Sequence, residues 1–527
     1  MLNTSKWAKI AKTRMVAEAP AMNFIYYLIY MSNHYNMPVL PTASSPLVTI
    51  TVDNKEVQVP GDTNLIEALK AVGIETPHLC YHGYLPVSGN CRQCLVEVEG
   101  PRGMALTIGC YTPVHAGMKV ATPASSPRVA EARKAVLEFL LVNHPLDCPI
   151  CDKAGECMLQ ENYIMAGASN SRLNPEVRKL YHGNPEHSST DSKGQHRGGK
   201  RVDLGPRIAL DEERCVQCDR CVRFMRHIAG DEQLQLASRG GHTYITTFPG
   251  EKLNHPYDRC VSDICPVGAL TDKAFRFRKR VWALSKVPTI SMDDSLGANI
   301  WVAYADGVVY RITPRCNAEV NRSWLSNAAR DVVQQVHENR LLSGDIPHAA
   351  QIIKETKGKI AIVLGASCTA EEIASFKKLA GKLGDKAQLF GGSFLPVQAA
   401  DGIARSGDPV ANRACFEKEG INANLKEFSQ KIKEFELLIT VSADLWDETP
   451  KEATVLDKIE THIALSPFNG NTAKRAALAI GIRHWIENSG TMINCKGLEQ
   501  KLQGVPTKEA EMAESAANIA NSLWELI

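Results

Sequence analysis

Alternating hydrophobic and polar residues near the N-terminus predict a β-hairpin followed by a short helix. The alternation runs over residues 47–59 and is interrupted by the turn dipeptide Asp53-Asn54, which favours a tight hairpin. Downstream, apolar residues recur at helical spacing, and Asn64 and Glu67 have the spacing of a capping box at the start of that helix. Gly73 is typical of a helix end. The pattern predicts a small α+β module.

A second helix is predicted from Ser126-Pro127 to Asn143, because apolar residues recur at helical spacing and His144-Pro145 stops the pattern. Residues 169–205 are rich in Ser, Asn, His, Gly and Lys, so we expect an exposed linker or insertion there. A further module is expected over about residues 206–285.

Beyond about residue 290 the pattern changes to alternating strands and helices. The apolar run 359–365 precedes a capping box formed by Thr369 and Glu372, and the runs 436–441 and 463–465 are typical of buried strands. These features predict a doubly wound α/β domain with a parallel sheet.

The chain contains neither Gly-x-Gly-x-x-Gly nor Gly-x4-Gly-Lys-Ser/Thr, so we expect no NAD or ATP binding through those loops.

Composition and charge are those of an ordinary soluble protein. The 527 residues correspond to three or four domains, and 44% hydrophobic with 22% charged residues argue against a disordered or fibrous chain. A net charge of +2 attracts neither nucleic acid nor acidic lipid strongly. The longest apolar stretch, residues 21–31, is about half a membrane span. Residues 1–46 are basic and acid-poor. Three interpretations remain open for them: a mitochondrial transit peptide, a secretory signal or a non-functional extension.

The 16 cysteines are the unusual feature, and 12 of them lie between Cys80 and Cys265. Their density is far below that of small secreted domains held by disulfides. Cys-x-x-Cys pairs in a long chain instead indicate metal sites in a reducing compartment. Eleven of the 12 fall into three groups. The five remaining cysteines are expected to be small buried apolar residues: Cys260, Cys316, Cys368, Cys415 and Cys495.

The first group is Cys80, Cys91, Cys94 and Cys110. Its close pair and late fourth cysteine fit the plant-type 2Fe-2S ferredoxin pattern, although the first gap is longer. Four thiolates also form structural zinc sites, so the spacing alone leaves zinc open.

The second group is His144, Cys148, Cys151 and Cys157. Three cysteines within ten residues need a fourth ligand, and His144 is the nearest side chain that can supply one. Imidazole in place of thiolate removes one negative charge from the cluster, and the net charge affects the reduction potential. A zinc site with three Cys and one His is the alternative.

The third group is Cys215, Cys218 and Cys221, followed by Cys265-Pro266. Three cysteines at this spacing with a distant Cys-Pro are typical of a 4Fe-4S cluster. Zinc sites favour separate Cys-x-x-Cys pairs, so zinc is disfavoured here.

Four stretches together resemble the large iron–sulfur subunit of respiratory complex I, NADH:quinone oxidoreductase, which is the G subunit in bacteria and the 75 kDa subunit in mitochondria. The stretches are Cys91-Arg-Gln-Cys-Leu-Val-Glu-Val98, Asn143-His-Pro-Leu-Asp-Cys-Pro-Ile-Cys-Asp-Lys-Ala-Gly-Glu-Cys157, Arg214-Cys-Val-Gln-Cys-Asp-Arg-Cys-Val-Arg-Phe224 and Asp263-Ile-Cys-Pro-Val-Gly-Ala-Leu270. The resemblance is specific over about residues 47–285 and weaker towards the end of the chain.

The resemblance implies that the first group binds a 2Fe-2S cluster and that the second and third groups each bind a 4Fe-4S cluster. It also implies a domain order. This order is an extension over 1–46, a 2Fe-2S ferredoxin-like β-grasp domain over 47–126, a helical 4Fe-4S domain over 127–168, the linker over 169–205, a ferredoxin-like 4Fe-4S domain over 206–285, and a molybdopterin-oxidoreductase-like domain over 286–527.

Two departures from the family pattern concern the C-terminal part. The chain stops short of a full-length member, so we expect this domain to be reduced. Residues 286–315 contain no cysteine and Cys316 is isolated, so we expect neither the extra cluster of some members nor bound molybdopterin. The segment 272–278 is more similar to bacterial members than to mitochondrial ones.

The function that the resemblance implies is an electron relay without catalytic residues, flavin or NAD on this chain. Electrons from NADH would enter through a flavin-bearing partner subunit and leave to a quinone-proximal subunit, coupled in the complex to proton translocation. The implied location is peripheral, at the cytoplasmic face of a bacterial inner membrane or, alternatively, at the matrix side of the mitochondrial inner membrane. The rival functions are a molybdenum enzyme similar to formate dehydrogenase, an iron-only hydrogenase and a zinc scaffold.

Overall fold

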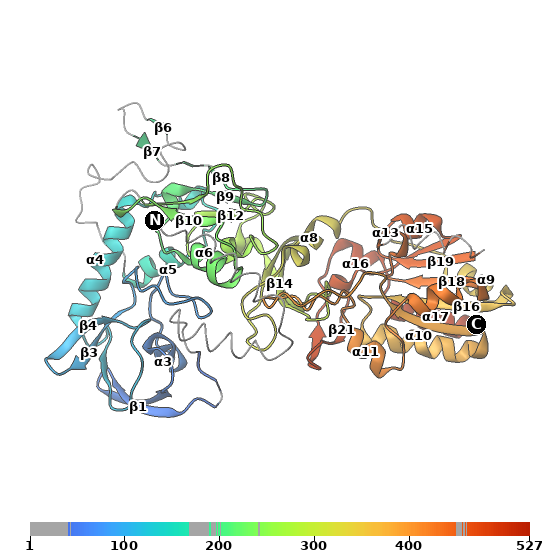
Figure 1. Cartoon of the computed structure of the whole chain (residues 1–527), viewed down its shortest axis with the longest axis horizontal. Coiled ribbons are helices and arrows are strands. Elements are labelled where there is room, and N and C mark those ends of the chain that lie inside the picture. The colour runs from blue at the N-terminus through green and yellow to red at the C-terminus, as the bar shows by residue number, and fades with distance from the viewer. Residues whose placement is uncertain are drawn as a thin grey trace, which may run out of the picture. The chain divides into compact units, whose positions relative to one another are not determined.

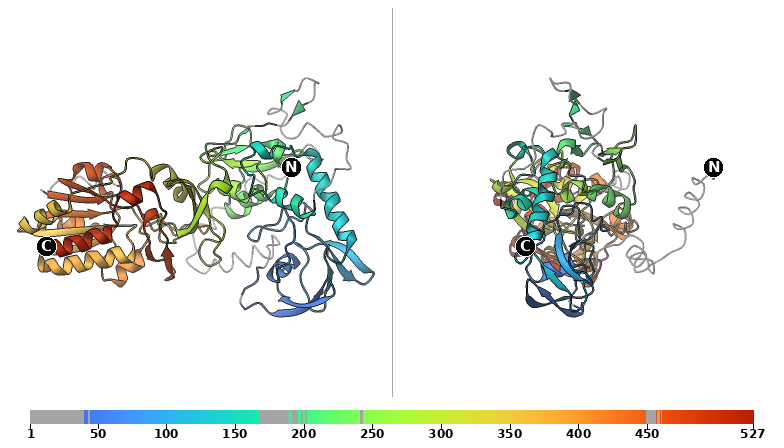
Figure 2. Two further views of the ribbon diagram at one scale, coloured as in Figure 1. Left: turned by 180° about the vertical axis from the view of Figure 1, so that it is seen from behind. Right: turned by 90° about the vertical axis from the view of Figure 1, so that its left-hand side faces the viewer.

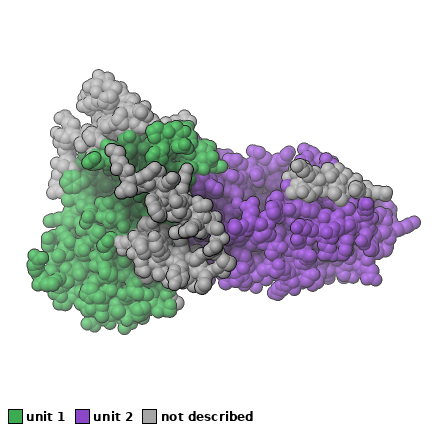
Figure 3. Space-filling model, viewed as in Figure 1, with its two compact units in different colours: residues 1–254, 264–271 green, residues 255–263, 272–527 purple. Residues whose placement is uncertain are grey.

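The structure is a computed structural model that describes residues 40–42, 44–167, 189–190, 196–197, 199–200, 202–240, 243–448, 456, 459 and 461–527. It has two compact units (Figure 3). Unit 1 comprises Met1–Asn254 and Ile264–Thr271, and unit 2 comprises His255–Asp263 and Asp272–Ile527. The expected extension over 1–46 and linker over 169–205 lie largely outside the described residues. No helix in the described ranges has the length and apolar character needed to cross a membrane.

Unit 1 begins with a five-stranded mixed sheet and one helix (Figure 1). The elements are β1 (Leu47–Val52), β2 (Lys55–Pro60), α3 (Leu65–Ala71), β3 (Leu95–Gly100), β4 (Gly103–Ile108) and β5 (Lys119–Ala121). The predicted hairpin of β1 and β2 is confirmed, and its turn residues Asp53 and Asn54 have φ angles of 50° and 64°. Such angles are those of the type I′ turn that tight hairpins favour. The strand order is β2-β1-β5-β3-β4.

The predicted capping box at the start of α3 is wrong. Asn64 occupies the N-cap position, but its side chain makes no cap hydrogen bond and instead donates to the carbonyl of Cys110 at 2.8 Å. Glu67 accepts a hydrogen bond from the hydroxyl of Tyr81 at 2.7 Å. The physical reason is that backbone carbonyls of the neighbouring loop already accept the first N–H groups of the helix, with Leu65 donating to Thr112 at 2.8 Å. Both side chains are therefore available to hold the cysteine loops.

The other helices and strands in the described residues of unit 1 lie between or beside the cysteines. They are α4 (Pro127–Asn143), a 3-10 helix (Cys148–Ile150), α5 (Met158–Met165), β6 (Ser189–Thr190), β7 (His196–Arg197), β8 (Val202–Asp203), β9 (Ile208–Leu210), a 3-10 helix (Glu212–Arg214), α6 (Arg220–Arg223), a π-helical turn (Phe224–Ile228), β10 (Leu234–Ala237), β11 (Tyr244–Thr247) and β12 (Leu270–Asp272). The predicted helix after Ser126 is confirmed, and the Ser126 hydroxyl accepts a hydrogen bond from the N–H of Val129 at 3.3 Å.

In its described residues, unit 2 contains a parallel sheet, the helices that cover it and two smaller antiparallel sheets (Figures 1 and 2). Its elements are α7 (Cys260–Ile264), β13 (Ser285–Ile290), β14 (Asn299–Ala305), β15 (Val308–Pro314), α8 (Asn327–Gln335), α9 (Ile346–Glu355), β16 (Lys359–Gly365), α10 (Ala370–Leu383), β17 (Ala387–Gly392), α11 (Arg413–Lys418), α12 (Lys426–Lys431), β18 (Phe435–Val441), α13 (Leu445–Glu448), β19 (Thr461–Ser466), α15 (Asn471–Arg475), β20 (Leu478–Gly481), β21 (Gly490–Ile493), β22 (Glu499–Leu502), α16 (Lys508–Met512) and α17 (Ala516–Leu526).

The predicted parallel sheet with helices on both faces is confirmed. Its strand order is β17-β16-β18-β19-β20, and all four pairings are parallel. Alternate residues of β16 point to opposite faces: Ile362 packs in one core with α9, α10 and α17, and Val363 packs in the other with α12 and α13. The capping box of Thr369 and Glu372 at the start of α10 is also confirmed. Both faces of the sheet are covered, as its continuous apolar runs require.

Two of the five cysteines outside the groups contradict the expectation of burial. Cys260, Cys368 and Cys415 are buried as predicted, but Cys316 and Cys495 are exposed. Cys316 lies in the loop after β15, and Cys495 lies in the turn between β21 and β22. The physical reason is that the backbone bends at the surface in both places, which leaves these side chains in contact with solvent.

The close approach of β16 to the residues after β18 predicts an intolerance of side chains at Gly365. A Cβ atom there would lie 1.9 Å from the carbonyl oxygen of Ser442, which is backbone and cannot rotate away. We expect Gly365→Ala to destabilise the chain by about 1–3 kcal/mol or more, as overpacking does. Gly381→Ala is the control. Gly381 lies in α10, and a Cβ atom added there would have no neighbouring atom within 4 Å. At such a position alanine adds up to about 1 kcal/mol of stability, because it favours the helix more than glycine does.

Thermal unfolding followed by circular dichroism measures both variants. A Gly365→Ala chain as stable as the unsubstituted chain would contradict the packing at this strand end.

Candidate metal centres

Four buried cysteines converge on loops beside α3, and they form two pairs. The side chains of Cys80 and Cys91 hydrogen-bond, which lowers the pKa of Cys91 to about 7 and raises that of Cys80. The contact between Cys94 and Cys110 likewise lowers the pKa of Cys94 and raises that of Cys110. All four are 8% exposed or less. A thiolate in each pair is thus stabilised by its neighbouring thiol.

The backbone around this first site holds the sulfur atoms in place. The N–H of Leu79 donates to the Sγ of Cys91 at 3.4 Å, and the N–H of Gly109 donates to the carbonyl of Cys94 at 2.9 Å. Together with the side chains of Asn64 and Glu67 on α3, these bonds fix the loops that carry the cysteines.

The second site is a small pocket lined by all four predicted residues, His144, Cys148, Cys151 and Cys157. His144 follows the last residue of α4, and Cys157 precedes the first residue of α5, so the two helices position the ends of this loop. Burial raises the pKa of both Cys151 and Cys157, whereas Cys148 is exposed. The loop between α4 and α5 therefore gathers one imidazole and three thiols around a single volume.

Gly268 closes one side of this second site. A Cβ atom at Gly268 would lie 2.2 Å from the Sγ of Cys151, so only glycine leaves room for the sulfur atom in its present position. Gly268 follows Cys265 by three residues, and the N–H of Met158 donates to the carbonyl of Pro266 at 2.9 Å. The second site is therefore packed directly against the loop of the third.

A buried ion pair also borders the second site. Arg214, whose side chain is 5% exposed, donates to Asp147 at 3.1 Å and lies 3.2 Å from Asp211. Lys200 reaches the same Asp147 carboxylate at 2.5 Å. Although burial raises the pKa of Asp147, the two cations hold it below its usual range. Because Arg214 precedes Cys215 in the chain, this ion pair links the second site to the third.

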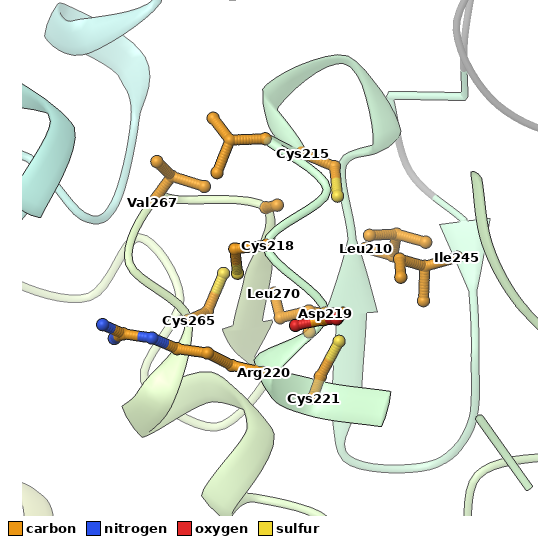
Figure 4. A pocket seen from close by; sticks show the side chains of 12 residues that line it. Leu210, Cys215, Cys218, Asp219, Arg220, Cys221, Ile245, Cys265, Val267 and Leu270 are labelled. Carbon is orange, nitrogen blue, oxygen red and sulfur yellow. The ribbon is translucent and has the colours of Figure 1, made fainter. Parts of the chain in front are cut away.

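The third site is a small pocket lined by Cys215, Cys218, Cys221 and Cys265. Their sulfur atoms face a common space (Figure 4). Gln217 and Asp219 have positive φ angles of 54° and 58°, which bend the loop around the pocket. Burial raises the pKa of Cys215 and Cys221, and that of Cys218 to about 12. Thiols in this apolar pocket therefore ionise only when a cation stabilises the thiolate.

Two buried arginines of α6 join the first site to the third. Arg223 donates to the carbonyls of Cys80 at 2.5 Å and Cys218 at 3.2 Å, and to that of Pro86. Arg220 donates to the carbonyl of Tyr81, the residue after Cys80. One short helix thus contacts the loops of two cysteine groups.

The structure brings the twelve predicted residues together in the three expected sets. The second and third sets each line a pocket, and the first set forms two contacting pairs. In the described part of the chain, no group of three or more His, Cys, Asp or Glu side chains could hold a single metal ion. Sequence reasoning missed Arg220, Arg223, Arg214 and Gly268. The available signal was their position within the cysteine motifs, where Arg214, Arg220 and Arg223 each lie within two residues of a cysteine.

Four protein-family models match the chain. They are described as a 2Fe-2S iron-sulfur cluster binding domain over residues 45–125, the NADH-ubiquinone oxidoreductase-G iron-sulfur binding region over 133–172, the ferredoxin-like domain of NADH-quinone oxidoreductase subunit 3 over 205–271, and an NDSU1/NuoG-like 4Fe-4S domain over 284–334. The last match contains a single cysteine, Cys316.

Curated relatives and a solved structure are also similar to the chain. The NADH-ubiquinone oxidoreductase 75 kDa subunit of Reclinomonas americana is 34% identical over 423 residues, covering 77% of this chain and 57% of the relative. The G subunit of the NADH-quinone oxidoreductase of Rickettsia felis is 35% identical over 358 residues, covering 64% and 49%. An NAD+-reducing [NiFe]-hydrogenase structure is 29% identical, covers 44% of this chain and 91% of its own, and has a TM-score of 0.36.

The chain spans about half the length of the curated relatives it matches. The iron–sulfur domain models and the relatives agree with one another on the family. The chain is a homologue of the large iron–sulfur subunit of NADH:quinone oxidoreductase, known as the G subunit or the 75 kDa subunit.

Proposed function

We propose that the chain is the iron–sulfur electron-relay subunit of an NADH:quinone oxidoreductase. The observation that carries this proposal is that three sets of four thiol or imidazole side chains lie within one compact unit. The family models for iron–sulfur domains over the same residues support it.

The first site suits a 2Fe-2S cluster bound by Cys80, Cys91, Cys94 and Cys110. Its four thiols are arranged as two pairs, which provides two ligands for each of two irons. The hydrogen bond from Cys80 lowers the pKa of Cys91, which favours the thiolate form that binds iron.

The second and third sites suit 4Fe-4S clusters. His144, Cys148, Cys151 and Cys157 surround one volume, and Cys215, Cys218, Cys221 and Cys265 surround another. The ligand chemistry is that of iron–sulfur proteins, because thiolates bind iron and one imidazole changes the cluster's net charge. We assign no cluster to residues 284–334, where Cys316 is the single cysteine, although a 4Fe-4S domain model matches them.

Bound clusters would supply one-electron transfer, which needs no substrate pocket on this chain. The residues of the chain hold the ligand loops, exclude water and set the local charge. We propose partners of two kinds, a flavin-bearing subunit that delivers electrons from NADH and a quinone-proximal subunit that accepts them. We further propose domain boundaries at 47–126, 127–168 and 206–285, with a reduced molybdopterin-oxidoreductase-like domain over 286–527 that binds no molybdenum.

The proposed location is peripheral, at the cytoplasmic face of a bacterial inner membrane, with the matrix side of the mitochondrial inner membrane as the alternative. Both bacterial and mitochondrial relatives match the chain.

Metal analysis of the anaerobically purified chain tests the proposed cofactors. We expect about ten irons per chain, because one 2Fe-2S and two 4Fe-4S clusters contain that number. Low-temperature EPR of the reduced chain should show one 2Fe-2S and two 4Fe-4S signals, with no molybdenum and no stoichiometric zinc. Stoichiometric zinc with fewer irons would overturn the relay at the site that holds it.

Substitution of the imidazole ligand tests the second site. We expect His144→Cys to retain a 4Fe-4S cluster but to lower its midpoint potential, because a fourth thiolate adds one negative charge. A redox titration followed by EPR measures the shift. His348→Cys, at an exposed position in unit 2, is the matched control and should change no potential. An unchanged potential in His144→Cys would mean that His144 is not a ligand.

Gly268 provides a test that separates cluster binding from folding. We expect Gly268→Ala to remove the second-site signal and reduce the iron content to about six, since a 4Fe-4S cluster prevents Cys151 from rotating away from the new Cβ. Without a cluster the Cys151 side chain can rotate, so the thermal stability of the metal-free chain should change little. Full iron content in Gly268→Ala would exclude the proposed position of Cys151, and Gly381→Ala serves as the control.

A further inference from the structure

Arg220 contacts a residue next to a predicted ligand of every one of the three sites. Its guanidinium donates to the carbonyl of Tyr81, which follows Cys80 in the first site. It donates to the Sδ of Met158 at 3.3 Å, the residue that follows Cys157 in the second site. It also donates to the carbonyl of Ile264 at 3.1 Å, the residue before Cys265 in the third site.

The Arg220 charge is buried without a carboxylate partner. Arg220 is 5% exposed, and in the described part of the chain no Asp or Glu lies within 4.0 Å of its guanidinium. Arg223, nearly one turn further along α6, differs because its Nε lies 2.6 Å from the carboxylate of Asp219. An uncompensated buried cation is destabilising, so it persists where negative charge offsets it.

The groups that can offset the charge of Arg220 are the cysteines of the predicted ligand sets, while the neighbouring cation Arg223 acts against it. Burial lowers the pKa of Arg220, and the groups that act in the opposite direction are Cys218, Cys80 and Cys265. Arginine remains protonated in proteins even when buried. The Arg220 cation therefore lies near cysteine side chains of the first and third sites.

We propose that Arg220 is a positioning residue that acts as the shared counter-charge of the three cluster sites. This inference rests on the proposed function, because it requires clusters at those sites. Each reduction adds one electron and one negative charge to a cluster, and a nearby fixed cation favours the reduced state. One arginine then raises the midpoint potentials of all three clusters. The differences between the three potentials change less than the potentials themselves.

A redox titration of the full chain, followed by low-temperature EPR, tests this role. The variants are Arg220→Gln, which removes the charge, and Arg220→Lys, which retains it. Arg226→Gln is the control, because Arg226 lies in the adjoining π-helical turn with its side chain 45% exposed and paired with Glu232. We expect Arg220→Gln to lower all three midpoint potentials, and Arg220→Lys and Arg226→Gln to leave them near those of the unsubstituted chain.

Unchanged potentials in a fully loaded Arg220→Gln chain, or a shift confined to one cluster, overturn the inference. If Arg220→Gln binds less iron, the Arg220→Lys chain provides the test. Midpoint potentials in Arg220→Lys equal to those of the unsubstituted chain support the inference. Midpoint potentials lowered in all three clusters of Arg220→Lys overturn it. Loss of clusters from both variants also overturns it, because Arg220 would then serve packing alone. Absence of clusters from the unsubstituted chain would instead refute the proposed function, and it is seen before any variant is compared.

Discussion

The structure of unit 1 depends on the cost of placing thiolates in an apolar interior. Burial raises the pKa of Cys215, Cys218 and Cys221, so these groups remain neutral unless positive charge reaches them. Iron in the proposed clusters would supply that charge, whereas the buried guanidinium of Arg220 only partly offsets the effect of burial on Cys218. The same low dielectric that makes the thiolates costly strengthens their attraction to these cations.

The elements around the sites serve mainly to hold loops. Asn64, just before α3, and Glu67, within α3, hydrogen-bond to the loops that carry Cys110 and Tyr81. Backbone carbonyls accept the first N–H groups of the helix instead of these side chains. The loop from Cys265 to Gly268 serves two sites, since it supplies one sulfur and makes room for another. The positions of the ligand loops depend less on helices and strands than on hydrogen bonds between segments far apart in the sequence.

Unit 2 is connected to the third site through the chain itself. Residues His255–Asp263 belong to unit 2, and the chain returns to unit 1 at Ile264, one residue before Cys265. Within unit 2 this segment is held by Arg330, which lies 2.6 Å from Asp263, and by the bond of Arg259 to Asp331 at 2.8 Å. These two ion pairs hold the segment within unit 2.

The sequence by itself determined the local features: the hairpin at Asp53-Asn54, the capping box at Thr369, the strands of the parallel sheet and the grouping of the cysteines. These depend on neighbouring residues and periodicity, which a single sequence displays. Only the tertiary structure decided that Asn64 and Glu67 hold loops, that Cys316 and Cys495 are exposed, and that Arg220 lies among three sites. The contacts of Asn64, Glu67 and Arg220 depend on segments that are distant in the sequence, and their approach leaves no periodic pattern along the chain. The exposure of Cys316 and Cys495 depends on where their loops reach the surface, which the pattern does not show either.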